Sequence, residues 1–169
     1  MPRENVELAR AVYPRPGSDI CRLFRDEGGF ARMRASGSRF FTDDFESVFV
    51  FPGETRTYAG LAGLRKAWLD WLEPWTTYRI GIEELVDVGD RVVVLDRDHA
   101  RRGDVDQEVE LVGATILTFR DGKVARWEFY GDRAEALEAA GLAGDVHALP
   151  PEHAVSRAET RDGLSNDRP

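Results

Sequence analysis

Apolar residues recur at helical spacing in the first third of the chain, which predicts three short helices there. The first ends near Tyr13, because the proline that follows disfavours helix at the preceding residue. The second begins after Asp19, a residue type that caps helices, and ends at the glycine pair 28–29. The third ends before Ser36. The apolar positions that carry this pattern are Val6, Ala9, Val12, Ile20, Leu23, Phe24, Phe30 and Met33.

The middle of the chain changes from a strand pattern to the strongest helical pattern of the sequence. Residues 45–51 have the sequence FESVFVF, which is aromatic and β-branched, and Pro52 and Gly53 close this predicted strand. Residues 61–75 then place apolar and charged side chains on separate stripes, so this long amphipathic helix should pack its aromatic face on a sheet. The apolar stripe consists of Leu61, Leu64, Trp68, Trp71, Leu72 and Trp75.

The remainder of the folded region predicts four strands in two hairpins. Residues 78–88 alternate up to a turn at Gly89, and residues 92–95 run back into the polar sequence DRDHARRG. Asp121 and Gly122 form a favoured hairpin turn between strands 108–119 and 123–130. A closing helix over 132–140 follows, with Asp132 as its cap. This order predicts an α+β fold with a curved, mostly antiparallel sheet wrapped around the helices.

The aromatic residues indicate where the folded domain ends. All seventeen lie between Tyr13 and Tyr130. The last stretch is rich in Pro, Gly, Asp, Arg and Ser, and so buries too little surface to offset its ordering entropy. We therefore predict one domain over residues 1–142 and a mobile or loosely docked tail over 143–169. The sequence HALPP at 147–151 is either a partner-binding segment or a solvated part of that tail.

Composition narrows the class of partner. The chain has 169 residues and a formal net charge of −8, which suits one domain and opposes binding to nucleic acid or to an anionic membrane. No apolar run approaches the roughly 20 residues of a bilayer span, and Glu4 and Glu7 interrupt any secretory signal, so we expect a cytoplasmic protein. Cys21 is the only cysteine, and phosphate-binding glycine loops and metal-ligand spacings are absent from the sequence. We expect no cofactor.

Several segments together resemble the nuclear transport factor 2-like superfamily, in particular its SnoaL-like branch of small bacterial proteins. The resemblance spans roughly residues 3–141 and is carried by ENVELARAVY, FFTDDFES, TYAGLAGLRKAWLDWL, VDVGDRVVVL and DGKVARWEFYGDRAEALEAAG. It implies a conical half-barrel, with a deep apolar pocket between the concave face of the sheet and the helices, commonly in a homodimer. Members of the superfamily include isomerases, cyclases, epoxide hydrolases, dehydratases and non-catalytic binding modules, so the fold alone does not choose a function.

Strand alternation identifies the residues that could do chemistry in such a pocket. It places Asp96 and Asp98 on the same face as the valines that precede them, and Arg97, His99 and Arg101 on the other face. Two carboxylates at this spacing lie roughly 6 to 7 Å apart, and in a dry pocket burial and repulsion would raise the pKa of at least one of them towards the range of a general acid or base. Alternatively, this segment is a solvated strand end whose aspartates pair with its own arginines.

The same alternation predicts which side chains line the pocket. We expect the three tryptophans of the long helix to form pocket wall or core, and the strand residues that share the face of the aspartates to form the rest. The predicted pocket residues are Ser47, Phe49, Trp68, Trp71, Leu111, Thr115, Leu117, Trp127 and Phe129.

The resemblance to ketosteroid isomerases implies a role for Tyr13, but the positions of both catalytic aspartates of those enzymes hold other residues here. Those enzymes resemble this chain in a tyrosine late in the first helix, which implies that Tyr13 hydrogen-bonds a substrate oxygen. Their general-base aspartate falls on Ser47, and their proton-donating aspartate falls near Thr115. Steroid-type isomerisation is therefore not expected.

Limonene epoxide hydrolases resemble the chain over its last two hairpins. One aspartate of their catalytic triad matches Asp98, but Asp96 stands at the arginine position and Phe129 at that of the second aspartate. Two hypotheses result. The first is a cofactor-free isomerase, cyclase or hydrolase of a small apolar carbonyl, polyketide or epoxide compound, in which Asp98 is the acid or base, Asp96 tunes it and Tyr13 positions an oxygen. The second is a non-catalytic ligand-binding or dimerisation module.

Overall fold

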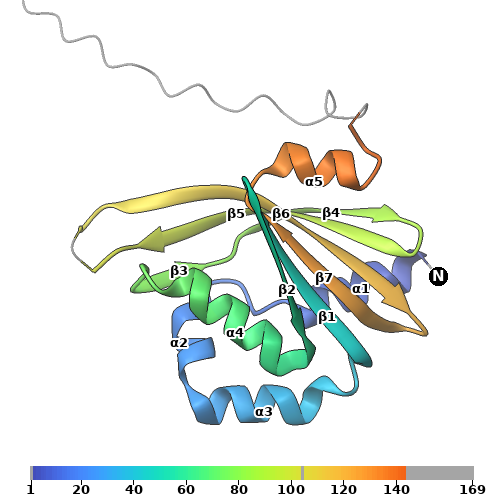
Figure 1. Cartoon of the computed structure of the whole chain (residues 1–169), viewed down its shortest axis with the longest axis horizontal. Coiled ribbons are helices and arrows are strands. Elements are labelled where there is room, and N and C mark those ends of the chain that lie inside the picture. Colours follow the sequence, from blue (N-terminus) through green and yellow to red (C-terminus); the bar gives the residue numbers. More distant parts are fainter. Residues whose placement is uncertain (1, 104, 144–169) are drawn as a thin grey trace, which may run out of the picture.

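One sheet organises the protein (Figure 1). In the computed structural model, residues 2–103 and 105–143 are described, and within them seven strands form the order β2-β1-β7-β6-β5-β3, with β4 also paired to β5. The elements are α1 (Pro2–Val12), α2 (Ile20–Arg25), α3 (Glu27–Gly37), β1 (Phe41–Phe51), β2 (Glu54–Ala59), α4 (Gly60–Leu72), β3 (Thr77–Arg79), β4 (Ile82–Val88), β5 (Arg91–Arg101), β6 (Glu108–Arg120), β7 (Lys123–Tyr130) and α5 (Arg133–Ala139).

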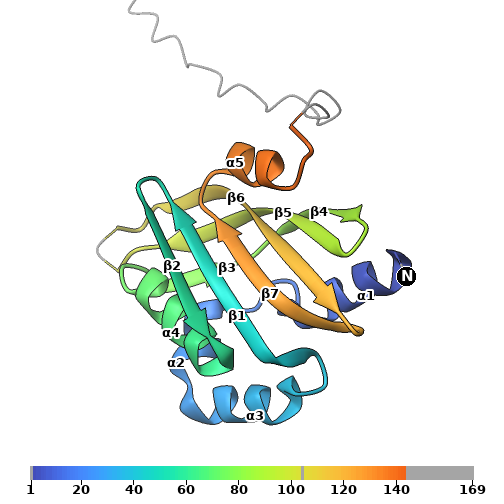
Figure 2. The same ribbon diagram turned by 45° about the vertical axis from the view of Figure 1, so that its right-hand side comes forward.

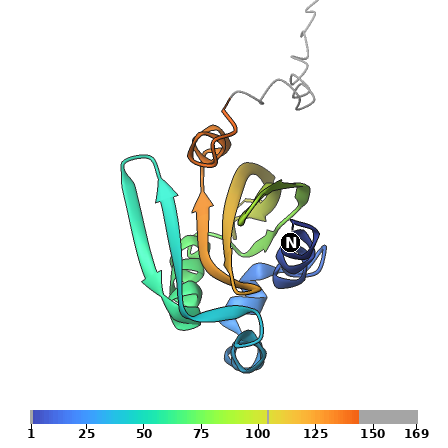
Figure 3. The ribbon, with the colours of Figure 1, turned by 90° about the vertical axis from the view of Figure 1, so that its right-hand side faces the viewer.

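The sheet separates two apolar layers. Its concave face and helices α1 to α4 enclose the larger core, in which Phe49, Trp68 and Tyr78 lie, whereas α5 covers part of the opposite face (Figure 1). Seen from the side, the sheet is curved, with the β1–β2 hairpin at one side of the molecule and α1 at the other (Figure 3). The predicted α+β architecture is thus confirmed: a conical half-barrel of a curved, mostly antiparallel sheet around the N-terminal helices and one long amphipathic helix.

Two aspartates define the N-terminal helices. Asp19 caps α2 as predicted, because its carboxylate accepts from the backbone N–H of Cys21 at 3.0 Å. The prediction that glycines 28–29 end this helix is wrong. Asp26 ends α2 and caps α3, accepting from Gly28 and Gly29 at 3.1 and 3.0 Å, so both glycines lie in the first turn of α3. Glycine is tolerated there because the carboxylate satisfies its N–H.

The strand β2 was not predicted, and it lies at the edge of the sheet (Figure 2). It pairs antiparallel with β1 through a turn at Pro52 and Gly53, the latter with a φ of 79°. Its sequence, ETRTYA, is almost wholly exposed, so it shows no apolar alternation. The helix predicted over 61–75 follows this hairpin; it begins at Gly60 and ends at Leu72, so Trp75 lies beyond its end.

The predicted continuous strand over 78–88 is two strands, β3 and β4, which pair with opposite ends of β5. The break lies at Gly81, whose carbonyl accepts from the N–H of Arg97 at 2.8 Å. A Cβ at this glycine would lie 2.5 Å from the carbonyl oxygen of Arg97, so only glycine allows the two backbones to approach this closely.

The strand β1 joins the two halves of the chain. It pairs with β7 in parallel, from Phe41 beside Val124 to Val50 beside Tyr130. The segment α1 to α4 is thereby fixed against the meander of β4 to β7, and the aromatic face of α4 packs on the sheet, with Trp68 centred 5.7 Å from Phe49. This contact confirms the expectation that the long helix lies on a sheet.

Two predictions concern other parts of the chain. The tail predicted over 143–169, with its HALPP sequence, lies outside the described residues except at position 143. No helix within 2–103 and 105–143 is long and apolar enough to cross a membrane.

Candidate functional site

The central strand β5 carries two buried carboxylates into the core. Asp96 and Asp98 are each 2 % exposed and lie on the same face of β5 as Val92 and Val94, as the alternation predicts. The strand continues to Arg101, so the alternative interpretation of a solvated strand end is wrong. The reason is tertiary, because β3 and β6 flank this part of β5 on both sides.

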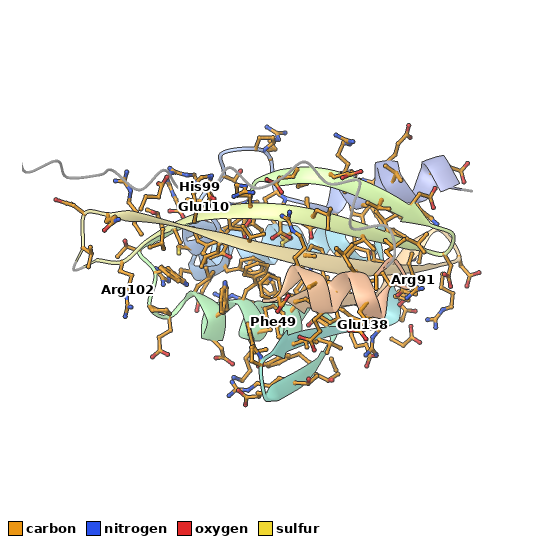
Figure 4. The ribbon with its side chains drawn as sticks, turned by 90° about the horizontal axis from the view of Figure 1, so that it is seen from above. Phe49, Arg91, His99, Arg102, Glu110 and Glu138 are labelled. Atoms are coloured by element: carbon orange, nitrogen blue, oxygen red, sulfur yellow. The ribbon has the colours of Figure 1, made fainter. Side chains whose placement is uncertain are left out.

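The cations of the same segment face the other way. Arg97 pairs with Glu83 at 2.6 Å and also with Glu110, and His99 lies 3.4 Å from Glu108. His99 and Glu110 are opposite each other on adjacent strands, and Figure 4 shows their side chains close together. These ion pairs occupy the cations on the outside of the sheet, so neither aspartate of the inner face is paired with Arg97 or Arg101.

Asp98 is held by two donors. The hydroxyl of Tyr78 donates to its Oδ2 at 2.6 Å, and the N–H of Gly81 approaches its Oδ1 at 3.4 Å. Burial raises the pKa of Asp98 from its ordinary 3.8 to about 6, although both hydrogen bonds oppose this rise. Burial and the charge of Asp98 in turn raise the pKa of Tyr78, so the tyrosine stays protonated and remains a donor.

Asp96 is less well satisfied. Its Oδ1 is buried without a hydrogen-bond partner among the described residues, and it lies over Gly113, where a Cβ would come within 2.9 Å of it. Burial, followed by the charge of Asp98, holds the pKa of Asp96 well above its ordinary value. Asp96 therefore holds its proton more firmly than an exposed aspartate does.

Arg133, at the start of α5, bridges the strands behind this carboxyl group. Its guanidinium donates to the backbone carbonyls of Gly113, at 3.1 Å, and of Asp96, and it pairs with Glu83 at 2.7 Å. Its positive charge opposes the rise in the pKa of Asp96. The N-cap Asp132, which accepts from Ala134 at 2.8 Å as predicted, fixes the helix end that carries Arg133.

Tyr13 approaches the carboxylates from the helical layer. Its ring stacks on Trp127 with centroids 4.9 Å apart, and its buried hydroxyl lies beside the hydroxyl of Thr115. Burial raises the pKa of Tyr13 well above its ordinary value, and the nearby charges of Asp96 and Asp98 raise it further. The three residues predicted to carry chemistry thus lie in one buried neighbourhood.

A cavity of about 260 Å³ lies between α1, α2, α3, α4 and the sheet. Tyr13, Trp68 and Trp127, three of the predicted site residues, line it. No charged side chain of the described residues lines it, and its other walls are mainly apolar, from residues such as Ile20, Phe24, Met33, Leu64 and Ile80. Neither aspartate borders this cavity; the hydroxyl-bearing ring of Tyr13 belongs both to its wall and to the surroundings of the carboxylates.

The remaining predicted pocket residues lie elsewhere in the concave core. Phe49 and Trp71 line a second hollow of about 250 Å³ between the β1–β2 hairpin and α4. Phe49 is labelled in Figure 4. The others line neither of these two cavities: Ser47, Thr115, Leu117 and Phe129 are buried and Leu111 is partly buried.

Tyr78, Gly113 and Arg133 are functional candidates that sequence reasoning missed. Tyr78 falls in a predicted strand, and a tyrosine among β-branched residues can offer a donor to the core. Gly113 interrupts an apolar strand, which is a recognised signal of close approach by another group. Arg133 carries no local signal, since its partners lie on strands distant in sequence.

Within residues 2–103 and 105–143, no three His, Cys, Asp or Glu side chains are grouped so that they could hold a metal ion.

Comparison with known proteins places this geometry in a family. The family model described as SnoaL-like domain matches residues 24–127. No curated protein matches the chain at a significant level. Among solved structures, TerC co-crystallised with polyporic acid is 24 % identical with a TM-score of 0.57, over 82 % of this chain and 98 % of TerC.

Two further structures are similar in fold. A protein from Jannaschia sp. that carries the name of a SnoaL-like polyketide cyclase is 23 % identical with a TM-score of 0.53, over 88 % of this chain and 94 % of its own. A nuclear transport factor 2-like protein of unknown function from Burkholderia pseudomallei is 18 % identical with a TM-score of 0.54, over 80 % and 95 %. The chain therefore belongs to the SnoaL-like family, and its fold is similar to that of the nuclear transport factor 2-like protein.

Proposed function

We propose that the protein is a cofactor-free enzyme that binds a small, mostly apolar carbonyl, polyketide or epoxide compound in the cone and acts on it by acid/base chemistry. The observation that carries the proposal is the position of Tyr13. Its side chain lines the apolar cavity, and its buried hydroxyl lies beside Thr115 and close enough to Asp96 and Asp98 to feel their charges. A substrate oxygen bound by this hydroxyl would lie next to a buried source of protons.

The geometry favours a different division of labour between the aspartates from the one the sequence suggests. Asp98 is engaged by Tyr78 and Gly81, whereas Oδ1 of Asp96 is unpartnered. Asp96 would therefore be the proton donor. Asp98, with a pKa of about 6, supplies the neighbouring negative charge that raises the pKa of Asp96 before the reaction. Tyr13 would hold the substrate oxygen.

The fold relatives support an organic ligand of this class. TerC was crystallised with polyporic acid, and the Jannaschia protein bears the name of a polyketide cyclase. Both similarities lie below 25 % identity, so they support the fold and the kind of pocket, and the chemistry rests on the residues of this chain.

A second candidate function is a ligand-binding module without catalysis. It is favoured by one observation: neither Asp96 nor Asp98 lines the cavity, and Tyr13 and Trp127 stand in its wall instead. In that case Asp96 and Asp98 would take no part in a reaction and would only be polar groups within the core.

A screen of the full chain decides between these functions. Thermal unfolding is measured with a panel of small aromatic polyketides, enones and epoxides. A ligand at about 100 times its Kd stabilises the fold by roughly 2.7 kcal/mol, which raises the Tm by a few degrees. Turnover of any hit is then followed in the wild type and in Asp96→Asn, Asp98→Asn and Tyr13→Phe.

The enzyme is supported if the hit is converted and Asp96→Asn binds it but loses turnover, while Asp43→Asn, an exposed carboxylate at the start of β1, behaves as the wild type. Binding without conversion by the wild type would establish the ligand-binding module. A panel in which no compound changes the Tm would exclude both.

A further inference from the structure

The hollow between the β1–β2 hairpin and α4 has an aromatic lining that solvent can reach (Figure 2). Phe51 and Trp71 stack in it with centroids 5.1 Å apart and planes inclined by 16°. Phe49 and Tyr58 meet edge to face at 6.1 Å. Phe51, Tyr58 and Trp71 are only partly buried, so this hollow of about 250 Å³ presents ring surface to a flat ligand.

Two ion pairs border this aromatic surface. Arg56 pairs with Glu54 at 2.7 Å, and Lys66 pairs with Asp70 at 2.8 Å. Glu54, Arg56 and Asp70 line the hollow, and the ammonium group of Lys66 lies 5.9 Å from the centre of the Tyr58 ring. These four charged side chains are between 38 and 67 % exposed. One small hollow therefore offers two positive and two negative charges beside aromatic rings.

These charged groups keep free capacity for a ligand. Both bonds that Arg56 gives to Glu54 end on Oε1. The bonds that Lys66 and Tyr58 give to Asp70 both end on Oδ2. Among the described residues, the second oxygen of each carboxylate is thus left for another donor. Exposed ion pairs contribute little to stability, so each group can exchange its partner for a ligand at small cost.

We infer that this hollow is a second binding site, for a small aromatic zwitterion such as a free aromatic amino acid. Its ring would pack on the aromatic lining, its carboxylate would accept from Arg56 and its ammonium group would donate to Asp70. Both protein groups lie beside the hydroxyl of Tyr58, so charges on one carbon atom of a ligand can reach them together. A ligand with a single charge would be attracted by two of the four groups and repelled by the other two.

Size restricts the ligand further. A cavity of about 150 Å³ holds one benzene ring, so about 250 Å³ suits two fused rings. The inference goes beyond the proposed function, because Tyr13, Asp96 and Asp98 do not line this hollow. A ligand bound here would be held without being offered to the buried carboxyl groups, and the two proposals stand or fall separately.

The test uses four probes with the same indole ring and different charges: tryptophan, tryptamine, indole-3-propionate and 3-ethylindole. Their dissociation constants are measured by calorimetry at low salt, where exposed charges are least screened, with the full chain as wild type, Arg56→Gln and Asp70→Asn. The controls are Arg120→Gln and Asp44→Asn, an exposed ion pair that lines neither described cavity. Thermal unfolding checks that each variant is folded, which exposed positions favour.

The expected result is that the wild type binds tryptophan about 3- to 10-fold more tightly than tryptamine or indole-3-propionate, the range of one charge-assisted hydrogen bond at an exposed site. In Arg56→Gln the carboxylate of the ligand should no longer count, so tryptophan and tryptamine should bind equally. In Asp70→Asn tryptophan and indole-3-propionate should bind equally, for the same reason. Both control variants should keep the preference of the wild type.

Three results would overturn the inference. The first is that either singly charged probe, or 3-ethylindole, binds the wild type as tightly as tryptophan does. The second is a preference for tryptophan that survives in both Arg56→Gln and Asp70→Asn, or that is lost in the controls. The third is that no probe binds the wild type.

Discussion

Tyr78 donates a hydrogen bond of 2.6 Å to Asp98, and both residues are almost completely closed to solvent. The tyrosine stands on β3 opposite Ala100, so its side chain reaches back along β5 to meet the carboxylate. This contact fixes the orientation of Asp98. It also leaves Asp96 as the carboxyl group of the pair with an unengaged oxygen.

The raised pKa of Asp98 predicts that replacing it with asparagine changes how stability depends on pH. In the native state its pKa is about 6, against 3.8 ordinarily, so the folded protein holds this proton more firmly than the unfolded chain does. Stability is therefore lost as pH rises through the interval between the two values. The free energy of unfolding of the wild type, relative to Asp98→Asn, should fall by about 2.5 kcal/mol from about pH 4 to about pH 8.

Urea denaturation at a series of pH values measures this difference, and asparagine still offers an acceptor to Tyr78. The control is Asp44→Asn, because hydrogen bonds from Thr42 and Arg120 lower the pKa of that exposed carboxylate. For Asp44 the pH dependence has the opposite sign: the free energy of unfolding of the wild type, relative to Asp44→Asn, should rise with pH. A flat difference for Asp98→Asn would contradict the prediction.

Tyr78→Phe should raise the pKa of Asp98 above about 6, because the tyrosine hydroxyl stabilises the ionised carboxylate. The stability lost should be about 1.5 to 3 kcal/mol at alkaline pH, where the bond is to a charged group, and smaller in mild acid, where Asp98 is neutral. Titration of the Asp98 carboxyl carbon by NMR checks the pKa.

Tyr58→Phe is the matched control, since the hydroxyl of Tyr58 contacts Asp70 at 3.4 Å in an exposed position. It should change stability by no more than about 0.5 kcal/mol. An unmoved Asp98 titration in Tyr78→Phe would show that the hydroxyl does not govern this carboxylate.

Gly113→Ala should displace the side chain of Asp96. The added methyl group would lie 2.9 Å from Oδ1 of Asp96 and 3.1 Å from the carbonyl oxygen of Tyr130. Overpacking of this kind costs about 1 to 3 kcal/mol. In an Asp96→Ala background the loss should be smaller by about 1 kcal/mol, because one of the two close contacts has gone. Urea denaturation of the four proteins measures the coupling, and additive effects would refute it.

Arg133→Met should destabilise the protein by about 1 to 3 kcal/mol, since two buried strand carbonyls lose a charged donor. It should also raise the pKa of Asp96 further, because the charge of Arg133 opposes that rise. Arg133→Lys keeps the charge but lacks the planar group that bridges the carbonyls, so it should restore the pKa more than the stability. Thermal unfolding together with NMR titration separates the two effects.

The sequence was sufficient to predict which way the charged residues of β5 point. Side chains alternate strictly in a strand, so Asp96 and Asp98 had to lie opposite Arg97, and the concave apolar face then identified the inner pair. It could not decide whether that end of the strand is solvated. The answer depends on Tyr78, which is 20 positions away along the chain from Asp98 and covers its carboxylate.

The strand β2 was not predicted because its residues are exposed, whereas Asp98 was uncertain because a distant residue buries it. An edge strand exposed on almost every residue has neither apolar period nor burial to reveal it, and only the turn at Pro52 and Gly53 and the alternating threonines Thr55 and Thr57 hint at a hairpin. The proximity of Asp96 to Gly113 likewise comes from cross-strand register, which no local pattern encodes.

Because β1 pairs in parallel with β7, the last strand of the sheet, the domain can complete its fold only late in translation. Tyr13 and Trp68 lie in the part of the chain that emerges first from the ribosome, whereas Trp127 lies on the last strand, so the cavity wall cannot close until nearly the whole domain has been translated. Until then β1 lacks its second neighbour and exposes an aromatic face, a state in which chains aggregate. A ligand that fits the cavity would favour the finished domain over this half-made intermediate, and could raise the yield of native protein during expression as well as its melting temperature.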